Sequence, residues 1–160
     1  MPSLKRDYST SVVPVQITGT AGAYSANDVM GGLLTIPIRN VSTGGLIGTV
    51  RARDYDNVRP ALVLYLFDAV PTTELDDNEA FALVDADSDK LIGTITIGDD
   101  NWTDYTAFGW AAKYGLDDTT QQNLDFRTLS GNLYAYAKCP NPTTMSTTTA
   151  LKLYFTIWGD

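Results

Sequence analysis

The 160-residue chain contains no histidine and only one cysteine, Cys139. These absences exclude catalytic triads that use histidine, zinc sites of cysteine and histidine, haem ligation by histidine and any disulfide within the chain. Serine and threonine are plentiful, but no histidine or matched lysine motif is present to activate a hydroxyl. The sequence therefore predicts a protein that is not an enzyme and needs no cofactor.

Positive charge is scarce as well, because 11 lysines and arginines stand against 19 acidic residues and give a formal net charge of -8. Proteins that bind nucleic acid gain affinity by neutralising phosphates, which requires the opposite sign of charge. The longest apolar run, residues 61–67, is far shorter than the roughly 20 residues of a membrane-spanning helix. We therefore expect no nucleic-acid partner and no membrane partner.

Apolar and polar residues alternate along most of the chain, which is the period of a β-strand. The clearest strand is 151–158, where Leu151, Leu153, Phe155 and Ile157 share the face assigned to the core. Residues 61–67 are apolar on both faces and are predicted to form a central strand covered on two sides. Further predicted strands are 12–18, 33–40, 46–53, 80–84, 91–97 and 132–139.

Two prolines fall inside predicted strands, and proline cannot donate a hydrogen bond to a neighbouring strand. The strands that contain Pro14 and Pro37 are therefore predicted to be edge strands or locally bulged. The only segment with helical spacing is 105–116, for which a short helix is predicted. With eight or nine strands, the sequence predicts an all-β, antiparallel β-sandwich or jelly roll. This single domain is assigned to residues 12–160 and an N-terminal arm to residues 1–11.

Two acidic clusters invite a chemical interpretation. Asp85, Asp87 and Asp89 have the spacing that opens a calcium loop, but the positions of the loop's glycine and glutamate hold Lys90 and Thr96. An acidic turn between strands is the favoured interpretation. The second cluster has the carboxylate pairs that glycoside hydrolysis uses, although a solvated loop is favoured there too. It consists of Glu74, Asp76, Asp77 and Glu79.

Residues 99–114 place aromatic rings next to carboxylates. Trp102, Tyr105 and Trp110 are interpreted first as rings that pack a long connection onto the sandwich. A protein-contact surface is the second interpretation and a sugar-stacking platform the third. In segment 46–53, the alternation predicts Leu46 in the core and places Arg51 and Arg53 on a face exposed to solvent or to a partner.

Several segments between residues 20 and 97, about half of the chain, resemble a known protein family. They are AYSANDVMGGLLTI at 23–36, PALVLYLFD at 60–68 followed by Pro71, DNEAF at 77–81 and LIGTI at 91–95. These segments are similar to the head decoration, or cement, proteins of tailed bacteriophages. The resemblance implies a β-sandwich or jelly roll, without catalytic residues, that binds the outside of an icosahedral head, often as a trimer.

We accordingly expect a virion structural protein on the outer surface of the head, with the major capsid protein as its partner. A homotrimer is expected, partly because apolar residues were assigned to outward faces. Those residues are Ile47, Ile92, Tyr134, Tyr136 and Trp158. The alternatives are a phage tail, baseplate or fibre domain and a carbohydrate-binding β-sandwich. The predicted contact residues are Leu4, Lys5, Arg6 and Tyr8 in the arm, together with Arg51, Arg53, Trp102, Tyr105 and Trp110.

Overall fold

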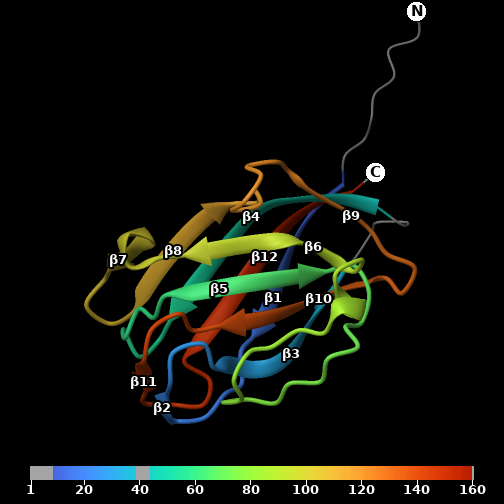
Figure 1. Cartoon of the computed structure of the whole chain (residues 1–160). Coiled ribbons are helices and arrows are strands. Elements are labelled where there is room, and N and C mark those ends of the chain that lie inside the picture. Colours follow the sequence, from blue (N-terminus) through green and yellow to red (C-terminus); the bar gives the residue numbers. More distant parts are fainter. Residues whose placement is uncertain (1–8, 39–43, 160) are drawn as a thin grey trace, which may run out of the picture.

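The computed structural model describes residues 9–38 and 44–159, which form two main antiparallel sheets (Figure 1). The six-stranded sheet has the order β1-β12-β4-β8-β7, and β9 pairs with β4 beyond the end of β8. Its strands are β1 (Ser9–Gln16), β4 (Gly44–Asp54), β7 (Trp102–Asp104), β8 (Gly109–Tyr114), β9 (Leu124–Arg127) and β12 (Leu151–Gly159). The prediction of an all-β, antiparallel sandwich is confirmed.

The second main sheet has four strands in the order β3-β10-β5-β6. They are β3 (Val29–Pro37), β5 (Leu62–Phe67), β6 (Leu91–Ile97) and β10 (Asn132–Lys138). The short strands β2 (Gly22–Tyr24) and β11 (Thr143–Met145) pair with each other, and two 3-10 turns, η1 (Asp85–Asp87) and η2 (Asp99–Asn101), flank β6. The described residues thus contain twelve strands where the sequence predicted eight or nine.

The core lies between the two main sheets and consists of the inward faces of their strands. Val50 of β4 and Phe155 of β12 meet Leu64 of β5 in one buried cluster, and all three side chains have no exposed surface. Strand β5 lies between β10 and β6, as the apolar run predicted. Strands β1 and β3, which hold Pro14 and Pro37, are edge strands of their sheets, as predicted.

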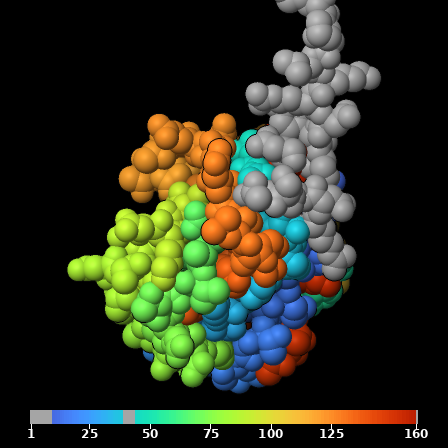
Figure 2. Space-filling model, turned by 90° about the vertical axis from the view of Figure 1, so that its right-hand side faces the viewer, coloured from blue at the N-terminus to red at the C-terminus, as the bar shows by residue number. Residues whose placement is uncertain are grey.

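Residues 68–90, which we call the cover, connect β5 to β6 and lie over the outer face of the four-stranded sheet. A second apolar cluster is buried between this sheet and the cover. Its members are Val29, Phe67, Tyr134 and Tyr136, with Tyr65, Leu75, Phe81, Leu83 and Leu91 packed against them. Figure 2 shows the cover in green along one flank of the molecule. Tyr134 and Tyr136 do lie on the outer face of their sheet, but the prediction that this face is exposed is wrong, because the cover packs its own apolar side chains on them.

Three predicted elements differ in the structure. Residues 109–114 form strand β8, paired with β4, and the predicted helix at 105–116 is absent from this described segment. Residues 80–84 belong to the cover and contribute only a single bridge, between Asp28 and Ala80, instead of a strand. Strand β1 begins at Ser9, so residues 9–11 belong to the sheet and not to an arm. The predicted contacts Leu4, Lys5, Arg6 and Tyr8 lie outside the described residues.

A β-bulge in β4 changes which residues face the core. The pairing of β4 with β12 skips Gly48, since Thr49 pairs with Thr156 and Ile47 with Ile157. The extra residue reverses the inward and outward positions on its N-terminal side. Ile47 is consequently buried in place of Leu46, and the predicted orientation of these two residues is wrong.

Candidate functional site

The outer face of the six-stranded sheet carries a ladder of cationic and aromatic side chains, which we call the arginine–aromatic face. It is built by alternate residues of β4, β8 and β12 and by the loops at one end of these strands. Its members are Arg51, Arg53, Tyr55, Phe108, Trp110, Lys152 and Tyr154.

Each of the two arginines lies between two aromatic rings. The guanidinium carbon of Arg53 is 4.5 Å from the ring centroids of both Tyr55 and Phe108. That of Arg51 is 5.6 Å from the Trp110 ring and 5.8 Å from the Tyr154 ring. Such cation–π contacts hold the planar guanidinium groups in fixed positions.

Neither arginine has an acidic partner among the residues that the structure describes. The Nε atoms of Arg51 and Arg53 are buried and have no hydrogen-bond partner there. The outward positions of β1, β8 and β12 add Lys152 but no Asp or Glu. A carboxylate on this side of the sheet is that of Asp125 in β9, which pairs with Leu46 at the opposite end and has Arg127 two residues away. Because each buried Nε–H group lacks a hydrogen-bond acceptor and the positive charge has no counter-charge beside it, this face favours a ligand that supplies carboxylates or other anions.

Tyr154 is half-buried between these cations. Burial, together with the neighbouring Tyr55, raises the pKa of the Tyr154 hydroxyl and outweighs the opposite effect of Arg53. Tyr154 therefore stays neutral at physiological pH and keeps a hydroxyl proton that it can donate to a partner.

The opposite end of the same sheet face is apolar. Tyr114 is 77 % exposed and Trp158 is 43 % exposed, and both line a hollow of about 180 Å³ floored by Ile47 and Gly48. A Cβ at residue 48 would lie 2.9 Å from the Trp158 ring, so the glycine allows the indole to lie flat on the strand. A larger hollow of about 580 Å³ adjoins it on the other side of Tyr114 and is lined partly by Lys113, Asp118 and Gln121.

The structure brings together Arg51, Arg53 and Trp110 from the predicted contact residues. Tyr105 lies beside them, since its ring stacks on Phe108 with centroids 5.2 Å apart. Trp102 does not join them. Its side chain is only 9 % exposed in the core, and its Nε1 donates a hydrogen bond to the Pro60 carbonyl oxygen at 3.0 Å. The prediction of Trp102 as a contact residue is thus wrong.

Sequence reasoning missed Tyr154 as part of this face, although the signal was available, whereas it did assign Trp158 to an outward face. Both occupy positions of 151–158 opposite the apolar residues assigned to the core. Phe108 precedes β8, and the pairing of β4 with β8 brings it to Arg53. Tyr55 follows Arg53 by two residues at the end of β4, which is the spacing of side chains on one face of a strand. The sequence carried no signal for the contact between Phe108 and Arg53.

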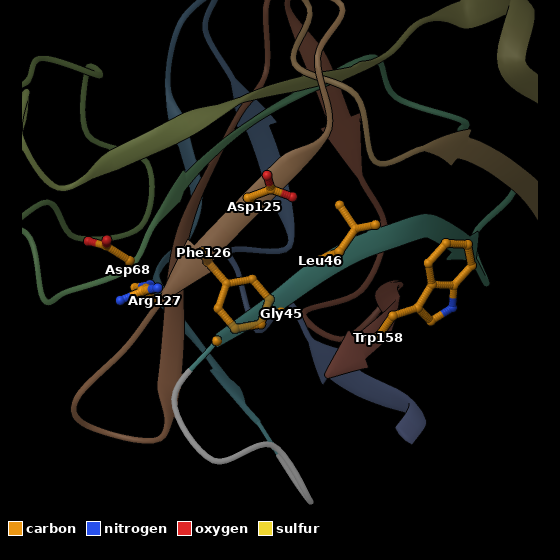
Figure 3. Close-up of a pocket in the computed structure, with 8 residues that line it drawn as sticks. Gly45, Leu46, Asp68, Asp125, Phe126, Arg127 and Trp158 are labelled. Carbon is orange, nitrogen blue, oxygen red and sulfur yellow. The ribbon is translucent and has the colours of Figure 1, made fainter. Parts of the chain in front are cut away.

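A third hollow, of about 610 Å³, lies where β4 begins and β9 runs alongside it. Figure 3 shows Asp68 and Arg127 at one side of it and Trp158 at the other. Burial raises the pKa of the Asp68 carboxyl. The lining holds two carboxylates, Asp68 and Asp125, and one arginine, so it has no strong preference for either sign of charge.

Each of the two acidic loops contributes one aspartate that anchors the fold through hydrogen bonds. Asp87 is fully buried and accepts hydrogen bonds from the backbone N–H groups of Thr72 and Thr73 and from the Thr73 hydroxyl. Within the two described ranges, no group of three or more potential ligands is placed to hold a metal ion. The residues predicted to start a calcium loop therefore form an anchored turn.

Asp77, from the second acidic cluster, ties the cover to the strands beneath it. Its Oδ1 accepts hydrogen bonds from the Gly31 N–H and, at 2.9 Å, from the Tyr24 hydroxyl. Burial and this hydrogen bond raise the pKa of Tyr24 to about 12. Asp77 therefore has a structural role in holding the cover, whereas Glu74, Asp76 and Glu79 are exposed.

Comparison of the chain with protein-family models and with curated proteins finds no match in either set. No helix in the described part of the chain has the length and apolar character to cross a membrane.

Proposed function

We propose that this protein is a non-enzymatic structural component of a tailed-bacteriophage virion that binds the outside of the head. The observation that carries the proposal is the arginine–aromatic face, supported by the all-β fold and by the resemblance of residues 20–97 to decoration proteins. Arginine, tyrosine and tryptophan are the residue types that contribute most to protein–protein binding, and here they share one sheet face.

The mechanism is stabilisation by mass action. A protein that binds the assembled shell, but not free capsid subunits, shifts the equilibrium toward the shell by an amount set by its concentration and affinity. Contacts that span two subunits have this property, because the complete binding surface exists only after assembly. The major capsid protein is the partner that this mechanism requires.

The proposed trimer is supported by the resemblance to decoration proteins and no longer by the apolar residues that were assigned to outward faces. Of the apolar residues assigned to outward faces, Ile47, Tyr134 and Tyr136 are buried and Ile92 packs against the core. Trp158 alone of that set is among the exposed residues. Contacts between copies in a trimer would therefore use surfaces other than the outer face of β10.

The test uses heads of the phage that encodes the chain, purified from a strain in which its gene is deleted. Purified protein is added, and occupancy is measured by co-sedimentation and located by cryo-electron microscopy. Density on the outer head surface is the expected result. Density at the tail, baseplate or fibres would replace this proposal with the alternative virion site, and no binding to the particle would contradict both.

A carbohydrate-binding module is the second candidate, favoured by Tyr114 and Trp158 on either side of a hollow. Aromatic faces stack on sugar rings. Titration with soluble polysaccharides, followed by Trp158 fluorescence and compared with Trp158→Phe, tests it. A saturable change that the variant loses would favour this second function over head binding.

A further inference from the structure

The net charge of this protein is concentrated in the cover. Residues 68–90 contain eight of the 19 acidic residues and only one basic residue, Lys90, and so carry a charge of -7 out of the total of -8. The rest of the chain is almost neutral. Five of the eight acidic residues in the cover are exposed, namely Glu74, Asp76, Glu79, Asp85 and Asp89.

The cover and the arginine–aromatic face lie on opposite sides of the sandwich. The cover packs on the outer face of the four-stranded sheet, whereas the arginines stand on the outer face of the six-stranded sheet. The molecule therefore has a cationic face and an anionic face separated by its two sheets. A charged partner orients such a molecule during encounter.

The side chains of Arg51 and Arg53 are preorganised to bind carboxylates. The aromatic rings beside Arg51 and Arg53 limit the freedom that each side chain would lose on binding. A guanidinium group matches a carboxylate with two parallel hydrogen bonds, and neither arginine forms an ion pair within residues 9–38 and 44–159. The face is thus a preorganised cationic surface.

A second copy of the chain does not suit this face. A two-fold contact centred on this face would bring its cations close to the same cations of the second copy, and repulsion between like charges disfavours that arrangement. A head-to-tail contact between the arginine–aromatic face and a cover would join opposite sides of the molecule, and such stacking gives open chains instead of closed oligomers. A different protein is therefore the occupant that the charges favour.

We propose that the arginine–aromatic face docks on a protein surface that presents carboxylates to Arg51 and Arg53 and an apolar side chain to the hollow between Tyr114 and Trp158. The cover then points away from this partner. The inference rests on the proposed function in one respect, since the head is the source of that surface. Arg51 is three residues from Gly48 in β4, so the carboxylates and the apolar side chain lie roughly 10 Å apart.

The first experiment measures affinity for heads that lack the protein. Arg51→Gln with Arg53→Gln should weaken binding by about 30-fold, and Tyr114→Ala by about 10-fold. Arg59→Gln with Arg127→Gln is the control of equal charge, because it removes two positive charges from arginines that are exposed and lie outside the proposed contact, Arg59 being paired with Asp104, and it should change affinity less than about 3-fold. Replacing Glu74, Asp85 and Asp89 in the cover by their amides should not weaken binding. Melting curves verify that all variants fold.

The inference would be overturned if the two arginine pairs weakened binding equally, or if the cover variant no longer bound heads. Either result would leave the proposed function standing, because the wild-type protein would still bind heads. Binding of wild-type protein should also fall as salt rises, since exposed charges are screened over roughly 10 Å at 0.1 M. The Arg51 and Arg53 variant should show less of this salt dependence.

The second experiment does not need heads and so separates the inference from the proposed function. The side-chain Nε–Hε NMR signals of the arginines are followed while a peptide of glutamate and leucine is added. Signals of Arg51 and Arg53 should shift, and those of Arg59 and Arg127 should not. Absence of these shifts would overturn the inference even if the protein binds heads. Larger shifts with an oligonucleotide of equal charge would instead show that the face prefers phosphates, and this result would also overturn the inference.

Discussion

Replacement of Asp87 is expected to loosen the cover and destabilise the protein. The Asp87 side chain has no exposed surface, and it accepts hydrogen bonds from Thr72 and Thr73, the backbone one from Thr73 at 3.0 Å. Lys90 Nζ lies 3.3 Å from its Oδ1. Asp87→Ala would leave these donors buried without an acceptor, so both ends of the cover would lose their common anchor.

The magnitude follows from those contacts. Breaking a buried, hydrogen-bonded charge pair by removing one partner costs about 3 to 5 kcal/mol of unfolding free energy. Asp87→Asn keeps one carbonyl oxygen and should cost about 2 to 3 kcal/mol, since hydrogen bonds to a charged acceptor contribute about 1.5 to 3 kcal/mol. In a domain of this size, a loss of 3 kcal/mol lowers Tm by roughly 6 to 12 °C.

The effect should depend on pH. Burial by itself would raise the pKa of Asp87, but the hydrogen bonds from Thr73 and Thr72 outweigh it and hold that pKa well below the usual range. The carboxylate is therefore more acidic in the folded than in the unfolded protein. Its stabilising contribution is complete above the unfolded pKa of roughly 3.9 and is lost as the pH falls through the folded pKa.

Urea unfolding of wild type and Asp87→Asn between pH 7 and pH 3 measures this contribution, with amide exchange at Tyr134 and Tyr136 as a local probe of the cover. Asp85→Asn and Asp89→Asn are the matched controls, because both side chains are exposed in the same turn. A difference of less than about 0.5 kcal/mol at pH 7 would refute the reasoning. So would controls as destabilised as Asp87→Asn.

Trp102→Phe should lose about 1 to 2 kcal/mol in urea unfolding, through its hydrogen bond to Pro60, with unchanged affinity for heads. A drop in affinity for heads at unchanged stability would show that Trp102 does contact the partner. Burial raises the pKa of the Cys139 thiol, so a thiol reagent at pH 8 should label Cys139 only in urea, and rapid labelling of native protein would contradict this. EDTA and reductant should leave Tm unchanged; a fall of several degrees with EDTA would reveal a bound ion. Deleting residues 2–10 should leave a folded domain by circular dichroism but lower its Tm slightly, because Ser9 and Thr10 pair with β12. Complete unfolding would contradict that prediction.

The pattern of apolar residues and prolines within a single strand was sufficient to predict which of its faces meets the core and whether it lies at an edge of its sheet. The alternation in 151–158 identified the core face of β12, and the apolar run at 61–67 identified β5 as an interior strand. Pro14 and Pro37 marked β1 and β3 as edge strands, because proline lacks the N–H group that an interior strand must donate. The arginines at 51 and 53 were placed on an outward face by the same period of two residues.

Tertiary structure decided the features that depend on distant partners. The helical spacing at 105–116 gave way to strand β8, because pairing with β4 satisfies its backbone and places Trp110 beside Arg51. Tyr136 became buried because the cover, contributed by residues about 60 positions earlier, packs on it, and the Thr73 carbonyl oxygen accepts a hydrogen bond from its hydroxyl. The bulge at Gly48 reversed the faces of the strand through pairing with β12. In each case the energy comes from contacts between segments far apart in the chain, and these contacts override local pattern.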